Sequence, residues 1–206
     1  MLRAQRLKDD PRDHKLRTYY HWVSRNVDFV ALDNATPDQF DAAQLKWFRS
    51  VIERDEASAD IRTIVAGMHA ALPGSLSASH SMSESAQGDR SGRQVYEALW
   101  HAQNAAGKRV YLLASHSHYY LEDVYRTDTW KDKVLPGWIV GTAGAVRYPL
   151  PAANGAAVYG YLLGTVAGDG RISFAFQPQS LDDLLRANQG KQPDRLVRWC
   201  YEENRQ

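Results

Sequence analysis

The sequence predicts an α/β fold built on a mixed sheet, and three observations lead to that prediction. Short apolar runs at Val27 to Leu32, Ile61 to Ala66 and Val110 to Ala114 have the length and composition of buried strands. Segments with helical periodicity separate these runs, as in the βαβ units of parallel sheets. Beyond residue 120, strand-like runs follow one another directly, so antiparallel pairs are expected beside the parallel ones.

Length and composition indicate about one folded domain without a strongly charged surface. The chain has 206 residues, 44% of them hydrophobic, which suffices for a substantial core. Lys and Arg total 25 against 24 for Asp and Glu. The composition therefore gives no electrostatic case for a nucleic-acid partner or an anionic membrane surface. The one cysteine, Cys200, excludes an intrachain disulfide.

Neither a membrane span nor a signal peptide is expected within the chain. No run of about 18 consecutive apolar residues occurs, and the basic residues near the N-terminus are not followed by an apolar segment. Residues 1–18 have the charged composition of a solvated lead-in. The sequence assigns no cellular compartment, since an extracytoplasmic location requires a targeting segment upstream of this chain.

Residues 36–57 have the pattern of an amphipathic helix between the first two strands. Thr36 and Pro37 form a suitable N-cap and first-turn pair, and the helix is expected to end at Ala57. Apolar residues recur along it at helical spacing, with charged residues on the other side. Two strands joined by such a helix normally run parallel.

The segment after the second strand contains the one low-complexity stretch. Residues 70–89 are rich in Ser and Gly and predict a mobile surface loop that begins directly after His69. Gln94 to Ala106 then predict a helix, with Gly107 placed to end it. Farther along, the pattern predicts strands at 138–146, 158–166 and 171–176, a tight turn at 167–170 and short helices at 182–188 and 194–202.

Three histidines are expected to meet at one edge of the predicted sheet. His69 follows the second strand, and His116 and His118 follow the third. Ligands bind beyond the carboxyl ends of parallel strands, because the loops converge there. An H-x-H pair in an extended segment places both imidazoles on one face, where they can hold one metal or two adjacent metals. The lack of cysteine ligands favours zinc, iron or manganese.

The other candidate residues have weaker patterns. An H-x-H pair alone is a weak signal, and the third histidine strengthens it. His80, in the Ser-rich stretch, is expected to be solvated, although a flexible histidine near a metal site could touch substrate. Tyr119 and Tyr120 are expected to pack in the core or at its rim, and Gly141 and Gly144 either serve strand bends or admit a ligand. No motif includes the remaining histidines, His14, His21 and His101.

The order of these segments resembles the C-terminal half of a calcineurin-like metallophosphoesterase, nearest to the purple acid phosphatase branch. The resemblance covers about residues 18–150 and rests on YYHWVSRNVDFVALDNA, a helix containing QLKWF, IVAGMHAALPG and VYLLASHSHYY. It implies part of a four-layer α-β-β-α sandwich, with residues 19–178 in that domain and 179–206 as a helical tail. It also implies that His69 and His116 bind one metal of a dinuclear centre and that His118 binds the other.

The activity implied by the resemblance is hydrolysis of a phosphoester, a monoester or a diester. Two metals, drawn from Fe, Zn and Mn, activate a hydroxide that attacks phosphorus. Ser115 stands where the family's last histidine motif has glycine. The upstream blocks D-x-H, G-D-x-x-D and G-N-H-[DE], which supply the bridging aspartate and most other ligands, do not occur in this sequence. We therefore expect the N-terminal half of the fold to be absent and the activity of this chain alone to be weak or lost.

Two other functions stay open on the sequence. One is a non-catalytic binding or assembly module that keeps the phosphoesterase shape, and the other is a mononuclear zinc hydrolase that uses the same three histidines. Asp33 and Asn34 are expected at the same sheet edge, but no motif assigns them the missing roles. An incomplete sheet would leave a strand edge exposed, which predicts self-association. Catalytic and substrate-binding residues beyond the metal ligands stay unassigned.

Overall fold

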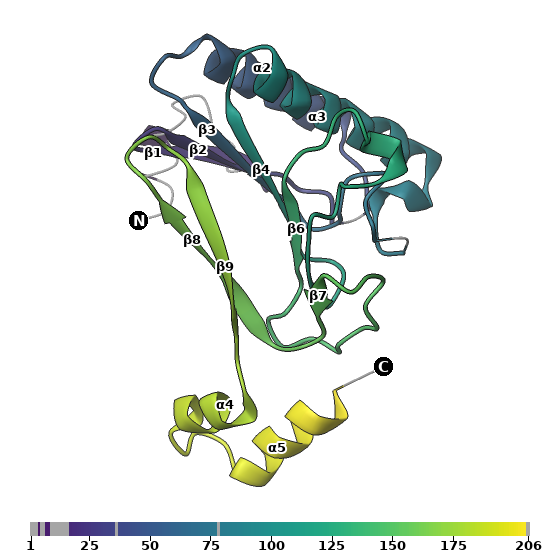
Figure 1. Ribbon diagram of the computed structural model, residues 1–206, viewed down its shortest axis with the longest axis vertical. Helices are drawn as coiled ribbons and strands as arrows, with labels where there is room; N and C mark the ends of the chain where they lie inside the picture. The colour runs from purple at the N-terminus through teal and green to yellow at the C-terminus, as the bar shows by residue number, and fades with distance from the viewer. Residues whose placement is uncertain (1–3, 5–6, 9–16, 36, 78, 205–206) are drawn as a thin grey trace.

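The computed structural model describes residues 4, 7–8, 17–35, 37–77 and 79–204. Its main element is a seven-stranded mixed sheet in the order β1-β2-β3-β4-β6-β5-β7, beside a two-stranded sheet of β8 and β9. Helices α2 and α3 cover one face of the large sheet, and β8 and β9 lie on its other side (Figure 1). The predicted α/β fold with a mixed sheet is confirmed.

The elements have the following bounds. The strands are β1 (Tyr20–Ser24), β2 (Val27–Ala31), β3 (Thr63–Gly67), β4 (Arg109–Ala114), β5 (Tyr120–Glu122), β6 (Gly137–Val140), β7 (Gly155–Ala156), β8 (Gly160–Val166) and β9 (Ile172–Pro178). The helices are α2 (Ala42–Ala57), η1 (Met82–Glu84), α3 (Ala86–Asn104), η2 (Asp128–Trp130), α4 (Leu181–Asn188) and α5 (Asp194–Glu203).

The predicted βαβ unit is present. Strands β2 and β3 pair in parallel with Val27 opposite Thr63, and β3 and β4 pair in parallel with Thr63 opposite Arg109. The helices bury their apolar faces against the sheet: Phe48 of α2 is 1% exposed and Leu99 of α3 is fully buried. Each such side chain contributes about 1.5–3 kcal/mol through burial. This packing aligns the carboxyl ends of three neighbouring strands.

Helix α2 begins later than predicted. The side chain of Asp41 accepts a hydrogen bond from Gln44 N at 2.7 Å, so Asp41 is the N-cap and the helix starts at the next residue. The Gln44 amide group then bonds both backbone groups of Asp33, at 2.8 and 2.7 Å, which ties the helix to the end of β2. Pro37 precedes the helix, and the predicted N-cap, Thr36, lies outside the described residues.

Helix α3 begins earlier than predicted, so the expected loop at 70–89 is wrong in its last part. The Ser85 side chain accepts a hydrogen bond from Gly88 N at 2.9 Å, and the helix starts directly after Ser85 rather than at Gln94. A Cβ atom at Gly88 would lie 2.5 Å from the carbonyl oxygen of Asp38. Glycine is therefore needed here for close packing of a helix, although a glycine in a Ser-rich segment is more typical of a loop.

Strands β8 and β9 form an antiparallel hairpin with Val166 opposite Ile172, and the predicted turn at 167–170 joins them. The inner face of the hairpin packs on the large sheet, where Ile172 meets Val27 and Val65 in a small second core. The described residues thus form a helix layer, a large sheet and a small sheet. These layers do not show the four-layer sandwich implied by the resemblance.

The strand predicted at 138–146 is wrong in its second half. β6 ends at Val140, and residues 143–145 form a backbone bend outside the strand. Three short strands, β1, β5 and β7, were not predicted. All three pair antiparallel to their neighbours, and β1 and β7 form the two edges of the large sheet.

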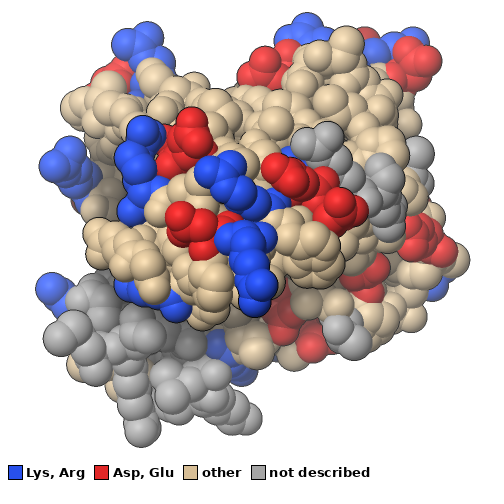
Figure 2. Space-filling view, turned by 90° about the horizontal axis from the view of Figure 1, so that it is seen from below, with Lys and Arg blue, Asp and Glu red and all other residues tan. Residues whose placement is uncertain are grey.

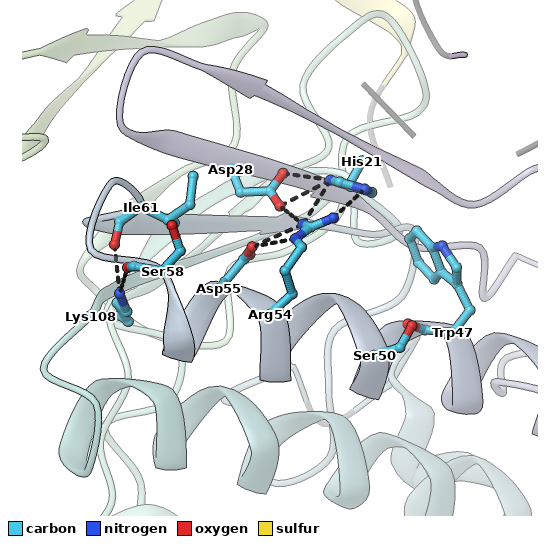
Figure 3. Close-up of polar contacts among 9 residues, drawn as sticks. All are labelled: His21, Asp28, Trp47, Ser50, Arg54, Asp55, Ser58, Ile61 and Lys108. Carbon is cyan, nitrogen blue, oxygen red and sulfur yellow. Dashed lines mark hydrogen bonds and ion pairs between the residues drawn. The ribbon is translucent and has the colours of Figure 1, made fainter. Parts of the chain in front are cut away.

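A buried polar network joins β1, β2 and α2 (Figure 3). His21 Nδ1 lies 3.0 Å from a carboxylate oxygen of Asp28, and Arg54 Nη2 donates to both Asp28 and Asp55 at 2.9 Å. The His21, Asp28 and Asp55 side chains are completely buried. Burial, followed by the charge of Asp28, raises the pKa of Asp55 to about 7. A single guanidinium therefore lies between two buried carboxyl groups.

Lys108 connects the end of α2 to the start of β4 (Figure 3). Its Nζ donates to the carbonyl oxygens of Ser58 at 2.6 Å and Ile61 at 2.7 Å, and the residue is only 8% exposed. Ser58 is the C-cap of α2. A cation at this end complements the negative pole of the helix dipole.

The chain ends in the predicted pair of short helices, α4 and α5, at the end of the molecule far from α2 and α3 (Figure 1). Arg147 attaches them to the body: its Nε donates to Asn204 O at 3.1 Å, and its guanidinium lies 5.0 Å from the centre of the Tyr201 ring. Cys200 is exposed with a free thiol. Most of the predicted lead-in, residues 1–18, falls outside the described residues.

The molecular surface seen from below carries basic and acidic side chains side by side (Figure 2). This mixture agrees with the net charge of +1 of the whole chain. Within the described part of the chain, no helix combines the length and the apolar character needed to cross a bilayer.

Candidate metal centre

The fold brings His69, His116 and His118 to the same edge of the large sheet. His69 lies just past the end of β3, and the H-x-H turn, residues 115–119, follows β4. Two backbone hydrogen bonds join the segments, because Ser115 N and His116 N both donate to His69 O, at 2.9 and 2.8 Å. The predicted convergence of these two loops is confirmed.

Asn34, from the loop after β2, holds the His69 backbone in place. Its Oδ1 accepts hydrogen bonds from His69 N at 2.9 Å and Ala70 N at 3.0 Å, while its Nδ2 donates to Ala70 O at 2.9 Å. The residue is 1% exposed. The Asn34 side chain is thus buried with its amide group hydrogen-bonded, and it fixes the backbone that carries His69. It is a positioning residue at the sheet edge where the sequence placed it.

The His116 ring lies between two other imidazoles. Its centroid is 4.4 Å from that of His69 and 4.9 Å from that of His80, which meets it edge-on at 86°. His80 is only partly exposed. His80 thus keeps part of the solvent exposure expected of it, but it is not isolated: the chain folds back after β3 and places this ring next to His116.

Tyr148 joins the two sides of the cluster. Its ring stacks on His80 at 5.1 Å between centroids and on His118 at 4.4 Å. Its backbone N also donates to His118 O at 3.2 Å. No sequence motif indicated Tyr148, since it comes from an irregular segment far along the chain. The site thus consists of four imidazoles and one phenol ring.

His118 is held with one ring nitrogen available for a ligand. Its Nδ1 lies 2.9 Å from the carbonyl oxygen of Val146. A carbonyl can only accept, so Nδ1 carries a proton, and Nε2 is the nitrogen left for a ligand. Metal-binding histidines are usually oriented in this way by a hydrogen bond from the other nitrogen.

The surroundings of His116 favour its neutral form. Burial lowers the pKa of His116, and the neighbouring His69 lowers it further, while the charge of Asp38 acts in the opposite direction. Smaller effects from His80 and His118 also lower it. A neutral imidazole is the form that binds metals.

Gly141 allows the end of β6 to pack against the H-x-H turn. A Cβ atom there would lie 2.0 Å from Ser117 O and 2.4 Å from Ser115 O. Such distances are far below van der Waals contact, so any side chain would displace the turn. Of the two roles considered for this glycine, the geometry supports close backbone packing next to the histidines.

Tyr119 and Tyr120 pack as the sequence predicted. Tyr119 is 5% exposed. Tyr120 stacks on Phe176 of β9 with the ring centroids 4.1 Å apart, and burial, followed by the charge of Glu122, raises its pKa to about 12. Tyr119 therefore belongs to the main core, and Tyr120 packs against the hairpin of β8 and β9.

The other histidines lie away from this cluster. His21 belongs to the buried network, and His101 pairs with Glu56 on the surface, with Nδ1 2.8 Å from the carboxylate. His14 lies outside the described residues. Across the described ranges, no three His, Cys, Asp or Glu side chains are arranged as a ready metal-binding group. Imidazoles are suitable metal donors, but the described residues do not form a complete ligand set.

A hollow of about 320 Å³ opens beside the cluster. It is lined by Met68 and Ser115, which neighbour His69 and His116 in sequence, and by Tyr161 of β8. Another cavity, of about 610 Å³, lies between the terminal helices and the loop after β6, and none of the four histidines lines it. None of the four histidines lines the smaller hollow either, which lies between the end of β4 and the start of β8.

Comparison with known proteins finds similarity at the level of the fold. No family model matches the sequence, and no curated protein matches it. Among solved structures, purple acid phosphatase from yellow lupin (Lupinus luteus) seeds superposes with a TM-score of 0.55 and 18% sequence identity. The match covers 86% of this chain and 33% of the phosphatase chain.

Other matches share less of the fold. An enoyl-CoA hydratase from Bacillus halodurans has a TM-score of 0.29 and 16% identity over 47% of this chain and 41% of its own. A putative enoyl-CoA hydratase/carnithine racemase from Magnetospirillum magneticum has a TM-score of 0.31 and 12% identity over 47% of this chain and 38% of its own. The fold of this chain is thus similar to that of a purple acid phosphatase, of which it spans about one third.

Proposed function

We propose that this chain belongs to a lineage of metal-dependent phosphoesterases and carries part of a dinuclear metal site. One observation carries the proposal: on a fold similar to that of a purple acid phosphatase, His69 and His116 lie 4.4 Å apart between ring centroids, with His118 in the same turn. We also propose that residues 19–178 form part of a phosphoesterase domain with a four-layer sandwich and that residues 179–206 form its tail.

In this proposal His69 and His116 hold one metal and His118 holds the other. The hydrogen bond from His118 Nδ1 to Val146 and the Asn34 brace on His69 orient two of these ligands. Bound Fe, Zn or Mn ions would supply charge neutralisation and an acidified water for hydrolysis. The protein itself contributes imidazoles that these hydrogen bonds hold in place.

His80 and Tyr148 are the groups that we assign to the substrate side. His80 meets His116 edge-on and stacks on Tyr148, so its ring is held next to the proposed ligands without being one of the three. An imidazole in that place can donate a hydrogen bond to a phosphoryl oxygen. Its function would be to orient the phosphoester.

The proposed site is incomplete in this chain. A dinuclear centre needs a bridging carboxylate, and the described residues offer no group of three metal-binding side chains. We therefore expect the chain alone to hydrolyse phosphoesters weakly or not at all, and a chain extended upstream with the missing aspartate blocks to be active. Because β1 is a sheet edge with Trp22 36% exposed, we also expect self-association, which sedimentation at several concentrations would detect.

Metal binding is the decisive test. Purified chain is titrated with Zn²⁺ and Mn²⁺, and binding is followed by calorimetry and by the NMR signals of the histidine rings. We expect the His69, His116 and His118 signals to change, and His116→Ala to lower the affinity at least about tenfold. His101→Ala is the matched control, since this histidine is exposed and pairs with Glu56 on another face.

Hydrolysis of an aryl phosphate is then measured on this chain and on an upstream-extended one. Activity that appears only with metal and is lost in His116→Ala supports the proposal. A chain that binds neither metal, with histidine signals unchanged, would instead be a non-catalytic module with the phosphoesterase shape. Activity that survives in His116→Ala would contradict both the dinuclear and the mononuclear metal mechanisms.

A further inference from the structure

Three hydroxyl groups meet next to the candidate metal centre. Ser77 Oγ lies 2.6 Å from Ser117 Oγ and 3.2 Å from Tyr119 Oη. Ser77 and Ser117 are 2% exposed and Tyr119 is 5% exposed. Ser77 belongs to the His80 loop, which we define as residues 75–77 and 79–81, whereas the other two belong to the H-x-H turn. The cluster therefore joins the two segments that carry His80 and His116.

The donors and acceptors of this cluster can be assigned. Ser77 Oγ also lies 2.7 Å from the carbonyl oxygen of Ser79. Because a carbonyl only accepts, Ser77 donates its one proton to Ser79, and its two lone pairs accept from the hydroxyls of Ser117 and Tyr119. The Ser77 hydroxyl is thereby saturated. Buried hydroxyls with a full set of partners hold their segments rigidly.

His80 occupies a backbone conformation that needs such support. Its φ is +57°, in the left-handed region that non-glycine residues rarely adopt. Its backbone N–H donates to the Glu84 carboxylate on the C-terminal side, and the hydroxyl cluster fixes the loop on the N-terminal side. Strained residues persist where surrounding contacts determine them, commonly beside functional sites.

We propose that Ser77, Ser117 and Tyr119 form a hydroxyl clamp that positions His80 against His116 for binding a phosphoryl oxyanion. The binding role rests on the proposed function, whereas the clamp itself rests on the contacts above. Ser77 and Ser117 are positioning residues: they act through His80 and touch neither metal nor substrate. Loss of either hydroxyl should free the His80 ring and leave His69, His116 and His118 in place.

The clamp is tested with Ser77→Ala, Ser117→Ala and the double variant, with Ser115→Ala as the control. Ser115 lies in the same turn but is exposed. The first readout is the rate at which diethyl pyrocarbonate modifies His80, followed by peptide mass spectrometry with His101 as the internal reference. The second readout is the affinity for Zn²⁺ and, for the zinc-loaded protein, the affinity for orthophosphate.

We expect Ser117→Ala to raise His80 modification about fivefold, the factor that corresponds to one buried hydrogen bond. Ser77→Ala should raise it at least as much, because it also removes the bonds to Ser79 and Tyr119. The double variant should show no more than Ser77→Ala alone, because that change already removes the contact between Ser77 and Ser117. Zinc affinity should stay unchanged while orthophosphate binding weakens by a similar factor. Additive effects, an unchanged His80 rate, or loss of zinc affinity in Ser117→Ala would overturn the clamp. If the wild type binds no zinc, the proposed function fails, yet the modification rates still decide whether the clamp exists.

Discussion

Replacing Asp55 with asparagine tests the buried network between β1, β2 and α2. Oδ1 of Asp55 accepts from Arg54 at 2.9 Å, and an asparagine oxygen can keep that bond. Oδ2 has no donor partner in the described part of the chain and lies beside Asp28. The asparagine NH₂ would donate to Asp28 there. The exchange therefore preserves the shape of the network (Figure 3) and removes one titrating group.

The expected effect follows from the pKa of Asp55. The folded-state pKa of about 7 lies above the unfolded value of 3.8, so the folded state binds its proton more tightly. The favourable contribution to stability is then complete below pH 3.8 and is lost as the pH rises through about 7. In full this amounts to about 4 kcal/mol, of which about 2–3 kcal/mol is lost between pH 5 and pH 8.

The assay is urea unfolding, followed by tryptophan fluorescence at constant ionic strength from pH 5 to pH 8. Between pH 5 and pH 8 the wild type should lose about 2–3 kcal/mol of its free energy of unfolding through this group. Asp55→Asn should not show this loss. Glu53→Gln, an exposed acid on the same helix, should keep the wild-type pH dependence. If Asp55→Asn also kept it, the argument that burial and Asp28 raise this pKa would be refuted.

Two further substitutions test the packing at the H-x-H turn and the polar contacts at the opposite end of β4. Gly141→Ala should displace the H-x-H turn and lower zinc affinity about tenfold, because a Cβ there would lie 2.0 Å from a turn carbonyl. The control is Gly67→Ala, whose Cβ meets no atom within 4 Å and which should bind zinc as the wild type does. Equal zinc affinities of the two variants in calorimetric titrations would contradict the packing argument. Lys108→Met should lower the free energy of unfolding, measured in urea, by about 1–3 kcal/mol, because it leaves the Ser58 and Ile61 carbonyls without their donor. An unchanged midpoint of the urea transition would show that water replaces the ammonium group.

Local sequence patterns predicted the strands whose own residues are apolar enough to identify them without knowledge of their neighbours in the fold. Strands β2, β3 and β4 and the hairpin of β8 and β9 were found from short β-branched or alternating runs, since such runs have few other ways to be buried. The helix starts were wrong for a different reason. Asp41 and Ser85 are the N-caps because their side chains meet free N–H groups, and other Ser, Thr and Asp residues nearby offer the same chemistry.

The Ser-rich stretch shows why composition can mislead. Gly88 and Ser85 resemble loop residues, yet one permits a close helix contact and the other caps that helix. The short strands β5 and β7 were missed because each is stabilised by its neighbours in the sheet, and their own sequences carry no alternation long enough to detect.

The sequence by itself determined that His69 and the H-x-H pair follow two successive parallel strands, and parallel pairing then requires the strand ends to share one edge. Only the tertiary structure decided which other groups join them. His80 and Tyr148 lie on opposite sides of the H-x-H pair along the chain, and the Ser77 to Ser117 bond links two separate loops. Their meeting depends on how irregular segments fold back over the sheet, and contacts between segments far apart in sequence leave no periodic pattern in either one.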